Sequence, residues 1–370
     1  MAVTTAPGRR SPVDHLRSLR RHLQAGASVG LRLGPLSTRV DVRAVVVSLI
    51  IATVVAVGLA WSVSVGDFPI PFGDVVKELT GIGGGSDSEF IIRGLRLPRA
   101  LTAVLVGAAF GISGQIFQRM VHNPLASPDI LGVSSGAAVM AVFAIVTWAS
   151  PSSVVTLWAL GGAVAAVAAI YLLAIKQGLS SYRLVLVGIG ITAMLDAVVA
   201  YLLTRAKLFD AQRATIWLTG SINGRGWEYV RPLTIALLVL VPLALISARG
   251  LKVLELGDDA AMGLGVGVRR SKLGLSLAAA GLAAVATAAA GPVGFVALVA
   301  PQIARRLIGG RSLGLIPAGL IGAAIMIFAD TLARRAFAPI ELPVGVVTAI
   351  VGAPYLLWLL ARANKIGSGG

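Results

Sequence analysis

Long apolar runs follow one another along most of the chain, separated by short polar segments. Eight runs are continuous and cover residues 44–64, 100–117, 130–149, 154–175, 184–204, 233–247, 273–290 and 344–360. Two more, residues 292–307 and 315–333, carry proline or polar interruptions. Because a hydrocarbon core about 30 Å thick requires roughly 20 apolar residues per helix, the pattern predicts ten membrane-spanning segments.

Composition favours helices that pack closely against one another. The chain is 56% hydrophobic and only 13% charged, and its mean hydropathy is +0.88. The apolar runs are continuous rather than alternating, which favours α-helices over a β-barrel, and 44 glycines allow close helix contacts. We therefore expect an all-α, polytopic membrane protein with about ten transmembrane helices in a compact bundle, formed by residues 44–361.

The net charge of +16 is distributed unevenly. Residues 1–43 carry eight arginines and read as a basic cytoplasmic tail near lipid headgroups, with nucleic-acid binding the lesser alternative. With residues 362–370 as a second cytoplasmic tail, the outer loops hold 11 of the 32 Lys and Arg residues and the cytoplasmic side the other 21. This sign agrees with the positive-inside rule, although an outer loop from Arg205 to Arg231 is itself basic.

One short stretch resembles a hydrolase motif. Residues 132–136 match G-x-S-x-G, the turn that holds a nucleophilic serine in α/β-hydrolases. Such a serine requires a nearby base, yet the histidines are His15 and His22 in the tail and His122 before a proline-containing turn. We therefore interpret the match as small residues that serve helix packing, and we expect no catalytic residue.

Five segments, in this order, resemble the FecCD-type permeases, the membrane subunits of ABC importers for iron–siderophore complexes, haem and vitamin B12. They are RLPRALTAVLVGAAFGISGQIFQ (96–118), NPLASPDILGVSSGA (123–137), LELGDDAAMGLGV (254–266), GPVGFVALVAPQIARRL (291–307) and LPVGVVTAIVGAPYLLWLL (342–360). Gln302 stands where the family usually has histidine, and Asp196 is an unexpected acid. The resemblance implies a type II ABC importer permease, most similar to the subunits that carry ferric enterobactin. Haem and cobalamin would use the same scaffold.

The same resemblance implies the partners and the location. It implies two copies of a cytoplasmic ABC ATPase, a second related permease and a lipid-anchored or periplasmic substrate-binding protein. The chain would lie in the cell membrane with both termini in the cytoplasm, without nucleic acid, cofactor or metal site, because the iron stays in its chelator. No G-x-x-x-x-G-K-[ST] motif occurs in the sequence, so ATP hydrolysis is expected on a partner chain.

The segment around residues 250–272 is the expected contact with the ATPase. Gly257 and Gly265 bracket a stretch in which Asp258 and Asp259 suit a helix N-terminus. By its pattern the segment is either an ordinary loop helix or a peg with a small apolar face, and the resemblance favours a coupling helix. The residues assigned to it are Leu256, Gly257, Asp258, Asp259, Ala260, Ala261, Leu264 and Gly265.

Polar residues in and between the second and third runs are candidates for the translocation pathway. They are Ser113, Gln115, Gln118, Asn123, Ser134 and Ser135. Polar side chains at membrane depth face either a water-filled cavity or a neighbouring helix, and both alternatives remain open.

Three arginines on the outer side are candidates for docking the substrate-binding protein. Arg96 and Arg99 flank Pro98, which suits the first turn of a helix, where cations are unfavourable. Arg334 has an alternative partner, because Asp330 lies four residues earlier. Headgroup phosphates are another alternative. In the family, the matching arginines receive acidic residues of the binding protein.

The main alternative function is a carrier driven by an ion gradient. Such carriers use ionisable residues inside the membrane, and Asp196 is the obvious candidate. No intramembrane His, Glu or Lys accompanies it, so we expect Asp196 to hydrogen-bond a neighbouring helix instead.

Overall fold

The computed structural model describes residues 28–33, 36–66, 68–81, 89–175, 181–255, 257–309 and 314–367, and all structural statements below concern these residues. Three sequence predictions lie outside them wholly or in part. These are the basic tail from residue 1 to 27 with His15 and His22, the coupling residue Leu256, and the end of the C-terminal tail from residue 368.

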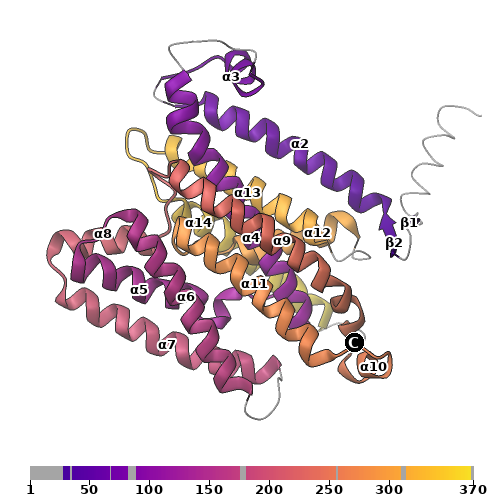
Figure 1. The fold of residues 1–370 in the computed structure, drawn as a ribbon. Helices are drawn as coiled ribbons and strands as arrows, with labels where there is room; N and C mark the ends of the chain where they lie inside the picture. Colours follow the sequence, from indigo (N-terminus) through magenta and orange to yellow (C-terminus); the bar gives the residue numbers. More distant parts are fainter. Residues whose placement is uncertain are drawn as a thin grey trace, which may run out of the picture.

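The described chain is a helical bundle, as predicted (Figure 1). Its longer helices are α2 (Val42–Ser64), α4 (Leu97–Val121), α5 (Val133–Trp148), α6 (Ser152–Ile175), α7 (Ser181–Arg205), α9 (Trp227–Leu254), α11 (Val268–Ala290), α12 (Val296–Ile308), α13 (Leu315–Arg335) and α14 (Val344–Gly367). Shorter elements are α3 (Phe72–Leu79), η1 (Phe90–Arg96), η2 (Pro128–Leu131), α8 (Leu208–Leu218) and α10 (Asp258–Gly263). One antiparallel hairpin, β1 (Ser28–Leu33) with β2 (Leu36–Asp41), lies where the sequence predicted only a tail.

Each of the ten apolar runs forms a helix, but not every helix is long enough to cross a bilayer. Seven helices within the described residues have the required length and apolarity, and α5 and the apolar part of α14 are shorter. Helix α12 has 13 residues, which at 1.5 Å per residue gives about 20 Å. The chain before it is not helical, and its N-cap Phe295 has a left-handed backbone with φ of 68°. The prediction of a full span at residues 292–307 is therefore wrong.

Helix α4 begins earlier than the sequence indicated. The π-helical segment η1 runs directly into it, so that residues 90–121 form one continuous helix. Pro98 occupies the first turn of the α-helical part, as predicted. Arg96 and Arg99, however, do not lie at a free helix N-terminus, so the dipole penalty that the sequence suggested does not apply to them.

Close packing around α4 depends on glycine, as the composition predicted. Helix α4 contacts α9, α11, α12 and α13. A Cβ atom on Gly107 would lie 2.2 Å from the carbonyl oxygen of Gly322 in α13, and one on Gly114 would lie 1.7 Å from that of Ala297 in α12. Helix backbones this close leave no room for a side chain, so glycine is required there.

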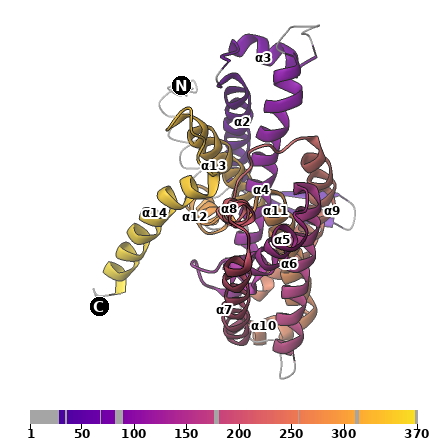
Figure 2. The same cartoon turned by 90° about the vertical axis from the view of Figure 1, so that its left-hand side faces the viewer.

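Two short helices mark opposite ends of the bundle. Helix α3 lies at one end and α10 at the other, and both views agree on this (Figures 1 and 2). Figure 2 also shows α14 projecting away from the remaining helices. We call the two ends the α3 end and the α10 end, and each carries one group of candidate functional residues.

Candidate functional sites at the two ends of the bundle

A buried carboxylate organises the α3 end. Asp330 in α13 is 1% exposed. Its Oδ1 accepts a hydrogen bond from Arg99 Nη2 at 2.9 Å, and its Oδ2 lies 3.3 Å from Arg334 Nε. Glu341 Oε2 accepts a further bond from Arg99 Nη1 at 3.0 Å. The Asp330–Arg334 pair that the sequence spacing allowed is therefore confirmed, and Arg99 joins it from α4.

The remaining donors of these arginines bind backbone carbonyls. Arg96 Nη2 donates to Phe68 O at 2.6 Å and its Nη1 to Val63 O at 2.9 Å. Arg334 Nη2 donates to Ser62 O at 3.0 Å. The structure thus brings Arg96, Arg99 and Arg334 together, but much of their hydrogen-bonding capacity is used within the chain. Headgroup phosphates are not needed to satisfy them.

A basic cavity opens beside this group. Its volume is about 460 Å³. Five arginines and two glutamates line it, namely Arg96, Arg99, Arg225, Arg334, Arg335, Glu228 and Glu341. Arg335 is exposed, whereas the three predicted arginines are partly buried. The excess of positive charge at this end suits an acidic partner surface.

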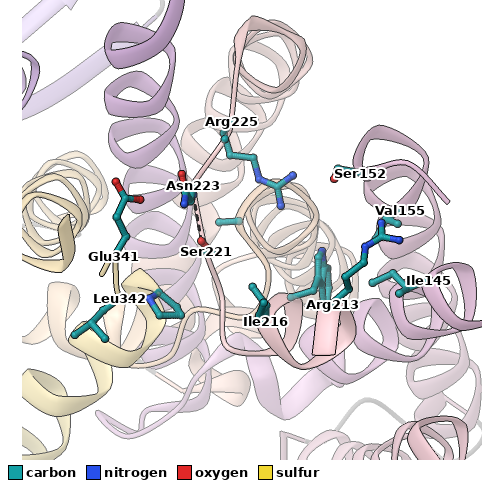
Figure 3. Close-up of a pocket in the computed structure, with 14 residues that line it drawn as sticks. Ile145, Ser152, Val155, Arg213, Ile216, Ser221, Asn223, Arg225, Glu341 and Leu342 are labelled. Carbon is teal, nitrogen blue, oxygen red and sulfur yellow. Dashed lines mark hydrogen bonds between the residues drawn. The ribbon is translucent and has the colours of Figure 1, made fainter. Parts of the chain in front are cut away.

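A second cavity of about 600 Å³ lies next to the first and shares Asn223, Arg225 and Glu341 with it. Figure 3 shows Arg213 of α8 and Arg225 of the following loop extending into it. Arg213 Nη2 also donates to Ser150 O at 3.0 Å. Apolar side chains such as Ile145, Val155 and Ile216 line the rest. In the sequence these arginines stood out only as positive charge in a loop expected on the outer side of the membrane.

The predicted coupling segment forms a short helix with a sharp entry and exit. Gly257 and Gly265 flank α10 with φ of 100° and 78°, values that favour glycine. Asp259 and Ala260 are exposed, and Leu264 is 65% exposed. Met262, which the sequence analysis did not name, is 58% exposed. Two large apolar side chains therefore project from this end of the bundle.

Ala261 does not belong to that surface. It is fully buried and packs into the main hydrophobic core of the bundle. Its assignment as a contact with the ATPase is therefore wrong. Successive side chains of a helix point in different directions, and that of Ala261 points into the bundle. The chain enters α10 through Gly257, whose φ is positive, and no side chain caps α10 there.

The predicted pathway residues divide into two groups. Ser113 and Gln115 are fully buried, and Ser113 Oγ donates to Ala279 O in α11 at 2.6 Å. Gln118 is buried and donates to Leu298 O in α12 at 2.9 Å. These three therefore lie between helices, the other alternative that the sequence left open. Gln118 also reaches the edge of a small cavity at the α10 end.

Hydrogen bonds within the chain account for the polar residues of the loop after α4. Asn123 Oδ1 accepts a bond from Leu125 N at 2.9 Å, and Ser127 caps η2. Ser134 donates to Asp129, which lies within η2, and α5 begins at Val133. Ser135 is partly buried. A Cβ on Gly136 would lie 2.5 Å from Gly162 O, which confirms that the G-x-S-x-G residues serve packing.

Asp196 does not have the partner that the sequence predicted. Its side chain is exposed on α7, the least buried of the seven long helices, and no hydrogen bond or ion pair to it occurs among the described residues. A carboxylate facing lipid is costly. The predicted bond to a neighbouring helix of this chain is therefore wrong.

Comparison with known proteins identifies the family. The model of the FecCD transport family matches residues 49–362. The chain belongs to this family. It is 38% identical to the ferric enterobactin transport system permease protein FepG of Escherichia coli (strain K12), over 87% of this chain and 98% of that protein. It is 39% identical to the probable siderophore transport system permease protein YfhA of Bacillus subtilis (strain 168), over 89% and 98%.

A solved structure supports the same conclusion. It is an inward-facing transporter described as of the metal-chelate ABC type, with a TM-score of 0.76 and 26% identity over 85% of this chain and 99% of that one. FecCD family members are ABC importer permease subunits, which are transport channels rather than enzymes. The protein is accordingly a multi-pass membrane permease, and the resemblance read from its motifs is confirmed.

Proposed function

We propose that this FecCD permease carries a ferric siderophore across the cytoplasmic membrane, driven by two ATPase subunits that contact α10. A second, related permease completes the passage, and a substrate-binding protein delivers the chelate at the α3 end. The observation that carries the proposal is α10 itself. Helix α10 lies at the end of the bundle between two glycines with positive φ, and its side chains Met262 and Leu264 are exposed. A small apolar peg of this kind suits a cleft in a partner protein.

Similarity to FepG and YfhA, whose names specify ferric enterobactin and a siderophore, supports the substrate class. The arginines of the α3 end support delivery by an acidic binding protein. Arg96, Arg99 and Arg334 form the base of this docking site, and exposed Arg335 lies at its rim. Asn123, Ser134 and Ser135 remain the proposed polar positions of the passage, and buried Gln118 only reaches the small cavity at the α10 end.

The test is a bulky side chain on the exposed side of α10. A Cβ on Gly263 would meet no atom within 4 Å, so Gly263→Trp should fold normally and block docking sterically. Gly73→Trp is the matched control, since Gly73 in α3 is equally open and lies at the opposite end. We expect Gly263→Trp to abolish co-purification of the ATPase and uptake of radioactive iron as ferric siderophore.

The control variant should retain co-purification of the ATPase, because it leaves the α10 end unchanged. Normal ATPase binding and uptake by Gly263→Trp would refute α10 as the contact. Uptake of haem or cobalamin, with no uptake of any ferric siderophore, would refute the substrate class while leaving the coupling assignment intact.

A further inference from the structure

A polar network at the base of α10 connects three helices that are distant in sequence. Glu255 follows α9 directly and lies two residues before Gly257, where α10 begins. Arg119, in the last turn of α4, donates from Nη1 to Glu255 Oε1 at 2.5 Å. The side chains are 13% and 31% exposed, so water screens this ion pair less than one on an open surface. The pair ties the entry of α10 to the end of the central helix.

The network continues from α4 into α12. Gln118 Oε1 accepts a hydrogen bond from Gln302 Nε2 at 2.7 Å and a longer one from Arg305 Nη2 at 3.4 Å. Gln302 also donates to Pro124 O at 2.8 Å, in the loop after α4. Consecutive residues of α4 therefore bind α9 on one side and α12 on the other. Gln302, at the position where histidine is usual, is part of this connection.

The charges around Glu255 are not balanced. A cavity of about 320 Å³ lies at this point, and Glu255 is the one carboxylate among the residues described around it, while Arg119 and Arg305 supply two cations. Arg305 is close enough to interact with the charges of both Arg119 and Glu255. Loss of the carboxylate would leave two arginines facing each other, which strongly favours the paired arrangement.

We propose that the Arg119–Glu255 ion pair is the positioning contact that transmits movement of α10 to α4, and through Gln118 and Gln302 to α12. This rests on the proposed function, in which the ATPase moves α10. Gly257 and Gly265 flank α10, and glycine restricts the backbone less than any other residue, so side-chain contacts are needed to fix α10 against the bundle. Ala261 anchors α10 by apolar contact, but such contact is non-directional, whereas a charge-assisted hydrogen bond fixes a geometry.

The first experiment does not involve the ATPase. The chain contains no cysteine, so Met262→Cys provides a single site for a spin label on exposed α10. In the full-length permease in nanodiscs, Glu255→Gln should increase the mobility of the label. Lys252→Gln, which removes an exposed charge three residues away on α9, should leave it unchanged. The double variant Arg119→Glu with Glu255→Arg should restore the original mobility. Unchanged mobility in Glu255→Gln would overturn the proposal.

The second experiment measures coupling in the assembled transporter. Glu255→Gln should bind the ATPase normally but transport several-fold less chelate per ATP hydrolysed, because the charge-assisted bond that fixes α10 against α4 is lost. The double variant should recover most of that ratio, which a purely structural defect would not. An unchanged ratio in Glu255→Gln would refute the transmission.

Different results would refute the contact of α10 with the ATPase and the role of the Arg119–Glu255 ion pair. If Gly263→Trp binds the ATPase normally, α10 is not the contact and the proposed function fails. The mobility measurement would still report whether the ion pair holds α10, since it uses the permease alone.

Discussion

At the scale of single residues, buried charges restrict which arginines can serve a partner. Asp330 is almost completely buried and forms ion pairs with Arg99 and Arg334. Arg96 donates hydrogen bonds to backbone carbonyls instead. A partner protein that competed for these groups would have to break buried charge pairs, which is costly. Exposed Arg335 carries no such cost, so it should contribute the electrostatic attraction that the approaching binding protein meets first.

Arg335→Glu should therefore weaken binding of the substrate-binding protein by roughly three- to tenfold, mainly by slowing association. It should also reduce the dependence of affinity on salt, because one attractive charge is replaced by a repulsive one. Affinity of the binding protein for the transporter in nanodiscs, measured at several salt concentrations, checks this. Thermal stability should stay the same, since Arg335 is exposed.

Arg334→Gln is the contrasting variant. It removes one of the two arginines that pair with buried Asp330, while Arg99 remains, so it should lower the free energy of unfolding by about 1–3 kcal/mol. If Arg335→Glu leaves affinity and salt dependence unchanged, the basic cavity is not the docking site.

Single-residue predictions from the sequence succeeded where the partner is close in the chain. The Asp330–Arg334 pair follows from a spacing of four residues on a helix, and the short helix α10 lies between Gly257 and Gly265, as their bracketing positions predicted. The Arg119–Glu255 and Gln118–Gln302 contacts join residues more than a hundred positions apart. Only the tertiary arrangement brings them together, so no local pattern could reveal them.

At the scale of helices, a glycine is required only where its position faces the backbone of a neighbouring helix. Gly161 and Gly162 are adjacent in α6 but face different surroundings. A Cβ on Gly162 would lie 2.2 Å from Gly136 O in α5, whereas one on Gly161 would meet no atom within 4 Å. The two positions therefore form a natural pair for testing whether close helix contact stabilises the bundle.

Gly162→Ala should lower the unfolding free energy by about 1–3 kcal/mol, because the methyl group forces α5 and α6 apart. Gly161→Ala should leave it unchanged or raise it by up to about 1 kcal/mol, because alanine is the better helix former. Thermal unfolding of the purified variants in one detergent measures both. Equal effects of the two substitutions would contradict the packing that the structure shows.

Helix positions were predictable from the sequence, and helix ends were less so. The runs at residues 44–64, 154–175 and 315–333 correspond closely to α2, α6 and α13. Helix α9 runs from Trp227 to Leu254, beyond the predicted 233–247 at both ends, and it includes Pro232, which does not end it. Prolines are tolerated in membrane helices when neighbouring groups satisfy the freed backbone, and hydropathy alone does not show this.

At the scale of the whole molecule, the distribution of charge predicts the orientation in the membrane. The tail of residues 1–43 holds eight arginines, and the chain enters α2 from that side. Figure 1 places α3 at the end where α2 finishes and α10 at the opposite end. The positive-inside rule therefore predicts that the tail and α10 face the cytoplasm and that α3 faces outward. The opposite orientation would place the proposed coupling helix out of reach of a cytoplasmic ATPase.

The absence of cysteine from the sequence makes this orientation directly measurable. Gly73→Cys and Met262→Cys introduce single thiols at exposed positions of α3 and α10. A maleimide that cannot cross membranes should label the Gly73→Cys variant in spheroplasts or intact cells. It should label the Met262→Cys variant only after the membrane is permeabilised, and bound ATPase should then protect that thiol because α10 is buried in the contact. Labelling of Met262→Cys from outside would reverse the orientation and exclude α10 as the coupling helix, whereas the buried helix contacts would remain as described.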